Sequence, residues 1–243
     1  MNKKNTRISW QWIFIFLMVY FCVLLNSCNC IECPECGECP ECTQCPGCPP
    51  LLHQIKGVNY YPSAHSWDLI WLEWAPEEIN VELDAVTDLD LNIIETYIHY
   101  PVFYSTTKRI VDQQMLNRLD EFLALVESKN CFAVLTLFDF VTDVSMPTWE
   151  DHKRYLDGVV GRFKDDSRIY MWGLHNEMNR LITENEQSPD SVIAWIEEMI
   201  KYIRSMDSFH QIELEINDPD AAIYLTDLDF DVLGLSFHDD PEV

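Results

Sequence analysis

The feature that most constrains the fold is a regular alternation of apolar, strand-like runs with amphipathic, helix-like segments after residue 50. The helix-like segments carry apolar residues at helical spacing, as Ile193, Ile196, Ile200 and Ile203 do. Such alternation predicts parallel strands joined by right-handed helical crossovers. The strands are predicted at 55–60, 91–97, 131–138, 168–175, 211–216 and 231–236, and the helices at 75–89, 111–128, 148–163, 190–206 and, for the most part, 218–228.

Two parallel architectures satisfy this pattern, an open doubly wound sheet and a closed (β/α)8 barrel. Thr148 is a plausible N-cap for the third helix, since its hydroxyl can accept from a backbone N–H of the first turn. A complete barrel takes roughly 250 residues. The sequence stops just after a sixth predicted strand, so a barrel of about six units is expected to be incomplete.

One strand ends in a cluster of polar residues. Residues 169–174 carry no charge, as expected of a strand that is covered on both faces, and His175, Asn176 and Glu177 follow directly. In a parallel barrel this end of the strand faces the catalytic rim. A carboxyl group beside a nearly dry strand is placed to have a raised pKa and to donate a proton. The plain alternative is a strand that runs into a polar loop.

The string Trp172-x-Leu174-x-Asn176-Glu177, entered by Asp-Ser-Arg-Ile, resembles the fourth-strand motif of clan A glycoside hydrolases, especially the cellulase and mannanase group of family 5. The resemblance favours the barrel. It implies that Glu177 is the general acid/base and that Asn176 holds the sugar 2-hydroxyl.

Weaker similarities extend the resemblance from Lys56 to the last residue. They assign Asn59 and Tyr60, at the end of the first strand, and His238, after the sixth, to the sugar cleft. The remaining similar stretches are 91–97, 135–139 and 217–222.

Three departures from the family are visible. Glu95 stands where the second strand usually carries an arginine, and Asp239 and Asp240 follow His238 where an aromatic residue is common. The family's nucleophile is a glutamate on a seventh strand, which this chain is expected to lack. Retaining hydrolysis needs two carboxyl groups about 5–5.5 Å apart, and Asp139 or Glu95 is only a weak candidate for the second.

Two functions therefore stay open. The first is a retaining glycoside hydrolase that acts on a neutral β-linked polysaccharide, of the β-glucan or β-mannan type. The second is a catalytically inactive carbohydrate-binding remnant of such an enzyme. A third, weaker hypothesis makes the Cys-rich segment a redox or metal device.

Residues 1–27 are predicted to be a lipoprotein signal peptide. A basic start precedes an apolar run from Ile13 to Leu25, and Leu25-Asn26-Ser27-Cys28 resembles a lipobox. Cys28 is then the lipidated N-terminus of an exported protein that is anchored to the membrane of the cell envelope or cell surface. The alternative is an uncleaved signal anchor.

Residues 28–50 are predicted to be an extended spacer. From residue 30 to residue 48 a cysteine occurs at every third position, with proline and glutamate between. Cys-x-x-Cys repeats also suggest a metal site. The proline content and the lack of apolar residues for a small core favour the spacer instead. The globular domain is expected to cover residues 51–243.

The formal net charge of −25 argues against binding nucleic acid, whose phosphates would repel the chain. We expect no cofactor and no metal, because no Gly-rich phosphate loop is found and His65, His99 and His152 show no convergent ligand spacing. His175 is predicted to be a packed neighbour of the site, and Cys131 a buried free thiol. Three tryptophans at i, i+4 and i+7 fit a sugar platform or a buried helix stripe equally well: Trp67, Trp71 and Trp74.

Overall fold

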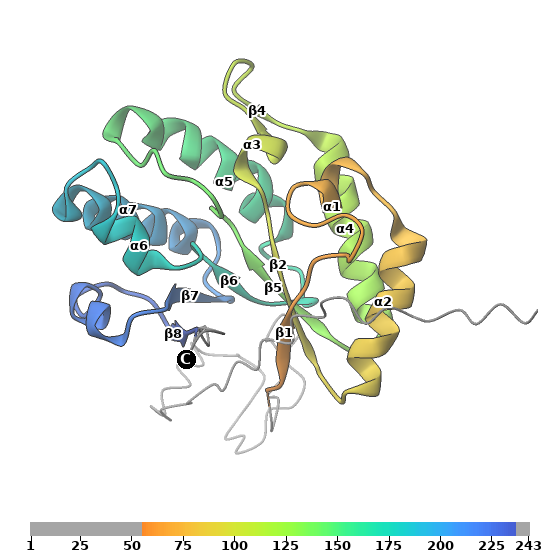
Figure 1. Ribbon diagram of the computed structural model, residues 1–243. Helices are drawn as coiled ribbons and strands as arrows, with labels where there is room; N and C mark the ends of the chain where they lie inside the picture. The colour runs from red at the N-terminus through yellow and green to blue at the C-terminus, as the bar shows by residue number, and fades with distance from the viewer. Residues whose placement is uncertain (1–54, 237–243) are drawn as a thin grey trace, which may run out of the picture.

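The computed structural model describes residues 55–236, whose centre is a six-stranded parallel sheet in the order β1-β2-β5-β6-β7-β8 (Figure 1). The predicted signal peptide, Cys28, the spacer and His238 lie outside the described residues. The strands are β1 Gly57–Asn59, β2 Ile93–Tyr97, β5 Phe132–Thr136, β6 Ile169–Gly173, β7 Gln211–Ile216 and β8 Val232–Leu235.

Helices connect these strands and lie around the curled sheet (Figure 1). They are α1 Leu69–Leu72, α2 Pro76–Asp88, α3 Tyr100–Phe103, α4 Gln113–Ser128, α5 Trp149–Phe163, α6 Met178–Thr183 and α7 Pro189–Met206. A small antiparallel hairpin, β3 Tyr104–Ser105 and β4 Ile110–Val111, stands apart from the main sheet. Six parallel strands with their crossovers confirm an incomplete (β/α)8 barrel.

The longer helices begin where their sequences provide caps. The side chain of Asp112 accepts from the backbone of the first turn of α4, and Ser188 does the same for α7, which has Pro189 in its first turn. Thr148 occupies the N-cap position of α5, as predicted, but its hydroxyl makes no capping hydrogen bond. The hydroxyl donates instead to the carbonyls of Asp143 and Ser145, because residues 146–148 already form a 3-10 turn before α5.

The helix predicted over residues 218–228 is also wrong in type. Pro219–Tyr224 forms a 3-10 helix, whose N-cap Asp218 accepts from the backbone of Asp220. The elements that the alternation did not predict include α1, α3, the β3–β4 hairpin and α6. Each is too short for its periodicity to be read from sequence, and all of them lie in connections that follow the carboxyl ends of strands.

The two faces of the sheet bury different residues. One face packs against the helices and forms the main apolar core, which includes Trp172, Leu214 and the buried thiol of Cys131. The other face carries a small apolar layer near the amino ends of the strands, formed by Ile93, Val134 and Met171. Because side chains alternate along a strand, Ile93 shares its face with Glu95, and the second face becomes polar toward the carboxyl ends.

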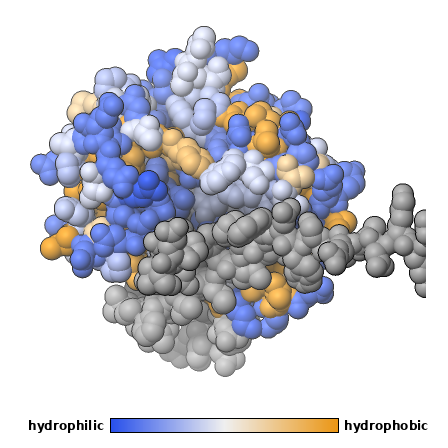
Figure 2. Space-filling view, in the orientation of Figure 1, coloured by the Kyte–Doolittle hydropathy of each residue, from blue (hydrophilic) through white to orange (hydrophobic). Residues whose placement is uncertain are grey.

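The surface in the orientation of Figure 1 is mainly hydrophilic, and its apolar area is divided into separate patches (Figure 2). Among the residues that the structure describes, no helix combines the length and the apolar composition needed to span a bilayer.

Two glycines on α5 allow a matched test of packing. A Cβ at Gly158 would lie 2.3 Å from a methyl carbon of Val111, whereas a Cβ at Gly161 would meet nothing within 4 Å. We therefore expect Gly161→Ala to stabilise the protein by about 0.5–1 kcal/mol, because alanine removes unfavourable backbone entropy from a helix. Gly158→Ala should instead destabilise it, since Val111 must move. Urea denaturation of both variants checks the prediction, and equal shifts would contradict this packing.

Candidate active site

The carboxyl ends of the six parallel strands meet at one edge of the sheet, and the candidate residues gather there. Glu177 follows β6, Asp139 follows β5, and Asn217 follows β7. Asn59 and Tyr97 are the last residues of β1 and β2. This edge is the place where barrels of this type build their active sites.

The backbone conformation of Glu177 and two side-chain contacts fix its position. Its backbone has φ 49° and ψ 54°, a left-handed conformation that lets α6 start abruptly after β6. Its Oε1 accepts from Asn217 Nδ2 at 2.8 Å, and its Oε2 accepts from Arg180 Nη1 at 2.8 Å. The side chain is 18% exposed, so the carboxyl group is partly buried and still reachable by a ligand.

Among the described residues, six other than glycine have a left-handed backbone; Arg109 lies in the turn of the β3–β4 hairpin, and the other five fall into two groups. Asp90 and Asn130 follow the ends of α2 and α4, where such a conformation is a common way to end a helix. Trp67, Phe140 and Glu177 instead lie in connections that follow the carboxyl ends of β1, β5 and β6. Strain of this kind persists where the surrounding structure requires it, and it is frequent at functional sites.

Asn176 is half-buried beside Glu177, and its side chain makes no hydrogen bond within the described part of the chain. Its carbonyl oxygen lies next to His175 Nδ1, and His175 Nε2 lies 3.0 Å from the carbonyl oxygen of Val141. Burial lowers the pKa of His175. This histidine therefore ties two rim loops together, as the sequence predicted for a packed neighbour.

The structure separates the two residues predicted at the end of the first strand. Asn59 Nδ2 donates to the hydroxyl of Tyr97 at 2.7 Å, which places Asn59 on the inner face. Tyr60 is buried among the outer helices, where its hydroxyl donates to Glu82 of α2 at 2.9 Å. The structure does not bring Tyr60 to the site. The next residue, Tyr61, stacks on Tyr97 and lies at the site where Tyr60 was expected.

A layer of buried carboxyl groups lies below the rim. Thr136 Oγ1 donates to Glu95 Oε1 at 2.8 Å. Burial and the nearby Glu213 and Glu215 raise the pKa of Glu95 well above its usual range. Gly173 makes room for this arrangement, since a Cβ there would lie 2.5 Å from Thr136 Oγ1. Glu95 is thus part of a buried layer of carboxyl groups, and its raised pKa follows from that burial.

Asp139 connects this layer to Glu177. It is 3% exposed, and the Tyr61 hydroxyl lies 3.4 Å from its Oδ2. Burial raises the pKa of Asp139 to about 7, and the charges of Glu215 and Glu177 add to the rise. Asp139 is therefore close enough to Glu177 for the two carboxyl groups to influence each other.

Five aromatic side chains form a continuous group at the rim, which we name the rim aromatic cluster: Tyr61, Trp67, Tyr97, His99 and Phe140. Trp67 and Phe140 are 54% and 56% exposed, and their ring centroids are 5.1 Å apart. His99 stacks under Phe140, and its buried Nε2 has no hydrogen-bond partner among the described residues.

The helix stripe considered for the three tryptophans does not exist as such. Trp67 lies before α1 in a left-handed conformation, whereas Trp71 is fully buried and its Nε1 donates to the carbonyl of Tyr97. Trp74 stacks on Trp71 and its Nε1 donates to Glu121. Of the three, only Trp67 can offer a ring face to a sugar.

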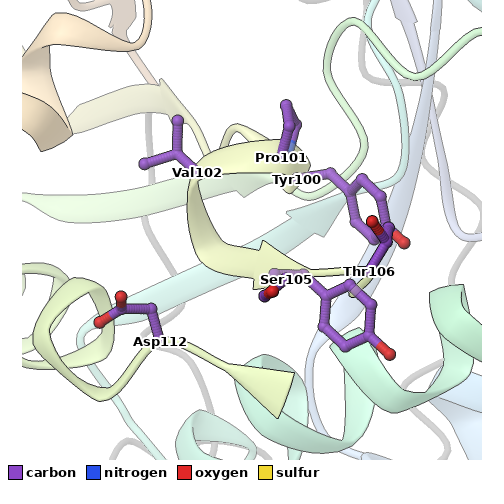
Figure 3. Close-up of a pocket in the computed structure, with 7 residues that line it drawn as sticks. Tyr100, Pro101, Val102, Ser105, Thr106 and Asp112 are labelled. Atoms are coloured by element: carbon purple, nitrogen blue, oxygen red, sulfur yellow. The ribbon is translucent and has the colours of Figure 1, made fainter. Parts of the chain in front are cut away.

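A hollow of about 320 Å³ lies beside α3 and the β3–β4 hairpin (Figure 3). Figure 3 shows Tyr100 and Asp112 on opposite sides of it, so that its polar groups do not converge. Asp112 is also occupied as the N-cap of α4. None of the candidate site residues lines this hollow, and we assign it no role.

The three histidines that the sequence analysis weighed as possible ligands lie in different surroundings. His65 faces Glu73 and Glu78, His152 accepts from Trp195 Nε1, and His99 belongs to the rim aromatic cluster. Between residues 55 and 236 no group of His, Cys, Asp and Glu side chains is arranged to hold a metal ion.

Sequence reasoning missed Asn179, Arg180 and Asn217, which contact Glu177 directly or through one another. A signal for Asn217 was present, because it follows a predicted strand directly, as Asn176 does. No sequence signal indicated Asn179 or Arg180, because α6 itself was not predicted.

The raised pKa of Asp139 predicts a pH-dependent stability. The folded state holds a proton on Asp139 up to about pH 7, whereas an unfolded aspartate loses it near pH 4. The free energy of unfolding should therefore fall between pH 4 and pH 7, by about 1.4 kcal/mol per unit from this group. Asp139→Asn should reduce that slope, and Asp227→Asn, at an exposed position, should not. Urea denaturation at several pH values checks this, and equal slopes in all three proteins would contradict it.

Comparison with known proteins adds sequence similarity to this geometry. No protein-family model matches the chain. It is 34% identical over 86 residues to mannan endo-1,4-beta-mannosidase 8 of Oryza sativa subsp. japonica, which covers 32% of this chain and 22% of that protein. It is 31% identical over 84 residues to mannan endo-1,4-beta-mannosidase 5 of Solanum lycopersicum, covering 31% and 19%. The chain thus matches about a fifth of the length of these curated relatives.

Solved structures share the fold. An exo-beta-1,4-mannosidase from Opitutaceae bacterium strain TAV5 matches with a TM-score of 0.58 at 20% identity, over 65% of this chain and 31% of that one. GH5_18 from Streptomyces cattleya, in complex with GlcNAc, matches with a TM-score of 0.56 at 15% identity, over 66% and 44%. A beta-1,4-D-mannanase from Cryptopygus antarcticus gives 0.51 at 13% identity, over 66% and 56%.

The two kinds of comparison agree with the arrangement of the strands. The solved structures support an incomplete barrel, and the plant relatives are endo-mannosidases by name. Together with the sequence motif that ends in Glu177, they confirm the resemblance of this chain to the cellulase and mannanase group of glycoside hydrolase family 5.

Proposed function

We propose that the chain is part of a glycoside hydrolase that cleaves a neutral β-linked polysaccharide, a β-mannan in preference to a β-glucan. The observation that carries this proposal is the partly buried carboxyl group of Glu177 at the carboxyl end of β6, next to Asp139 and an exposed aromatic pair. Mannan is favoured as the substrate because the curated relatives are named as mannan endo-1,4-beta-mannosidases. The negative net charge of the chain favours a neutral substrate over an anionic one.

The proposed reaction proceeds with retention. Glu177 protonates the glycosidic oxygen as its bond to the anomeric carbon breaks, and a nucleophilic carboxylate forms a covalent bond to that carbon. In the second step Glu177 takes a proton from water, which displaces the carboxylate. The half-buried Asn176 is placed beside Glu177 to bind the 2-hydroxyl.

The nucleophile is assigned by resemblance to a glutamate on a seventh strand. No main-sheet strand follows β8 among residues 55–236. Asp139, which has a raised pKa, is a poor substitute because a nucleophile must be ionised. We therefore expect mannan hydrolysis only in a form of the protein that carries this additional strand.

Trp67 and Phe140 are proposed to bind one face of a sugar ring. Aromatic faces pack against the apolar C–H face of a pyranose, and burying that face accounts for roughly 1–2 kcal/mol.

Export and lipid attachment at Cys28 are proposed from the sequence alone. A mature N-terminal peptide that begins at an acylated Cys28 would support them in mass spectrometry, and a retained signal segment would refute them.

The aromatic pair gives a binding prediction that does not need turnover. Trp67→Ala and Phe140→Ala should each weaken mannohexaose binding about 5- to 30-fold. Phe209→Ala is the matched control, because Phe209 is 53% exposed but lies at the amino end of β7. Isothermal titration calorimetry measures all three. Equal loss in the control, or no loss in either rim variant, would exclude the pair as a sugar site.

The acid/base role gives a kinetic prediction. In a form that hydrolyses mannan, Glu177→Gln should lower the rate about 10²–10⁴-fold, because the amide keeps the shape of the side chain but supplies no proton. Formation of the covalent intermediate from an activated aryl mannoside should be spared, since its leaving group needs little protonation. Pre-steady-state and steady-state assays with both substrates test this.

Two outcomes would argue against the proposal. If Glu177→Gln hydrolyses mannan as fast as its parent, Glu177 is only a solvated rim carboxylate. If mannohexaose binds but no form of the protein that carries the seventh strand hydrolyses it, the carbohydrate-binding alternative holds.

A further inference from the structure

Two asparagines beside Glu177 form a hydrogen-bonded pair whose polarity is set by the backbone. The backbone N–H of Asn217 donates to Asn179 Oδ1 at 2.9 Å. A backbone N–H can only donate, so the oxygen of the Asn179 amide must face it. The other end of this amide then faces the Asn217 side chain, and Asn179 Nδ2 donates to Asn217 Oδ1 at 2.7 Å.

The orientation of the Asn217 side-chain amide in turn determines which of its atoms faces the carboxyl group of Glu177. Because Asn217 Oδ1 is engaged with Asn179, the Nδ2 of Asn217 points the other way and donates to Glu177 Oε1 at 2.8 Å. Asn179 is buried on α6, and Asn217 directly follows β7. The chain of donors and acceptors thus leaves no choice of amide orientation, and it makes Glu177 Oε1 an acceptor.

The second oxygen of Glu177 faces a cation. Arg180 Nη1 lies 2.8 Å from Glu177 Oε2, one turn along α6. A guanidinium group donates only, so Oε2 is also an acceptor while this contact lasts. Arg180 is 56% exposed and shares its charge with Glu184, whose Oε2 is 3.3 Å from Arg180 Nε. Ion pairs at the surface contribute little free energy, so breaking this contact costs little free energy.

This inference rests on the proposed role of Glu177 as an acid. We propose that Asn179, acting through Asn217, is a positioning residue that reserves Oε1 of Glu177 as an acceptor, so that the acidic proton resides on Oε2. We further propose that Arg180 keeps Oε2 unprotonated until it leaves that oxygen, and that a bound sugar takes its place. Glu177 can then donate its proton from Oε2 only.

Other ionisable groups also lie near Glu177. Asp139, after β5, has its pKa raised to about 7 and stays protonated below that pH. His175, after β6, is buried, and burial lowers its pKa. Glu184 contacts the same guanidinium as Glu177. Among these groups, Arg180 is the cation that directly contacts Glu177.

The experiment is a carbon NMR titration of the full chain, labelled with ¹³C at the glutamate carboxyl carbons. The Glu177 resonance is assigned by its absence in Glu177→Gln. Arg180→Gln should move the titration midpoint of Glu177 upward by about one pH unit or more, because an opposite charge next to a carboxylate favours its ionised form. Arg180→Lys should restore most of the shift.

Two variants control for general effects of charge. Glu184→Gln removes the other partner of Arg180 and should produce no upward shift. Lys201→Gln removes an exposed ion pair with Glu197 on α7, which does not touch Glu177, and should leave the midpoint unchanged. An unchanged midpoint in Arg180→Gln, or the same rise in Lys201→Gln, would overturn the role of Arg180.

The asparagine pair is tested by the side-chain amide resonances of Asn217. They should follow the titration of Glu177 in the parent protein and lose this dependence in Glu177→Gln. Asn179→Asp supplies only acceptors, so the Asn217 amide should turn over and present its oxygen to Glu177. Its nitrogen resonance should then cease to follow Glu177, and the midpoint of Glu177 should rise.

If Asn179→Asp does not fold, the amide titration of the parent protein still decides the polarity of the pair. If the Asn217 amide resonances of the parent protein do not change when Glu177 is protonated, the proposed polarity of the pair is wrong. These titrations need no turnover. A failure of mannan hydrolysis with intact titrations would refute the proposed function alone, and absent titration effects with normal hydrolysis would refute only this inference.

Discussion

The parallel direction of the strands is the constraint on which the site depends. Each strand of the main sheet is joined to the next by a crossover on the outer face, so all six carboxyl ends lie at one edge. Residues far apart in sequence therefore become neighbours, and Glu177 contacts Asn217 across 40 positions. A strand in the opposite direction would carry its polar end to the far side of the sheet and leave Glu177 without this partner.

The inner face of the sheet carries both apolar and acidic side chains. Ile93, Val134 and Met171 form a small apolar layer on it, and Glu95, Glu213 and Glu215 lie almost fully buried on the same face. Burying carboxyl groups near one another is costly when they are charged, so the raised pKa of Glu95 is the expected response. Burial likewise raises the pKa of Asp139 at the rim. Glu177 differs from these groups because it contacts the Arg180 guanidinium as well as the Asn217 amide.

The two ends of the sheet use polar groups differently. At the amino end of β7, Asp207 accepts from Trp172 Nε1, lies 2.7 Å from His210 Nδ1 and also accepts two backbone N–H groups. Asp207 and His210 are buried and fully engaged, which fits a role in stability. At the carboxyl end, Trp67 and Phe140 are exposed and held in left-handed conformations. The polar groups at the amino end are thus buried in stabilising contacts, whereas the aromatic groups at the carboxyl end are presented to solvent.

The sequence alone determined the class of fold, because the period of the apolar residues distinguishes strand from helix before any tertiary contact exists. It placed 211–216 as a strand without error and put Glu177 at a strand end. It also failed locally: Tyr60 faces Glu82 rather than the cleft, and Thr148 stands at the N-cap of α5 without the expected side-chain hydrogen bond. A shift of one position reverses the face of a strand residue, and such a shift cannot be read from a short apolar run.

The tertiary structure alone decided which groups meet Glu177. Arg180 reaches it only because the left-handed turn at Glu177 starts α6 at once, and the Asn179–Asn217 pair exists only because β6 and β7 are neighbours. Hydrogen-bond polarity between these side chains depends on distances of about 3 Å, which strand pairing and crossover length set together. The sequence therefore determined where a carboxyl group of this kind would stand, and the packed fold decided which of its oxygens each neighbour contacts.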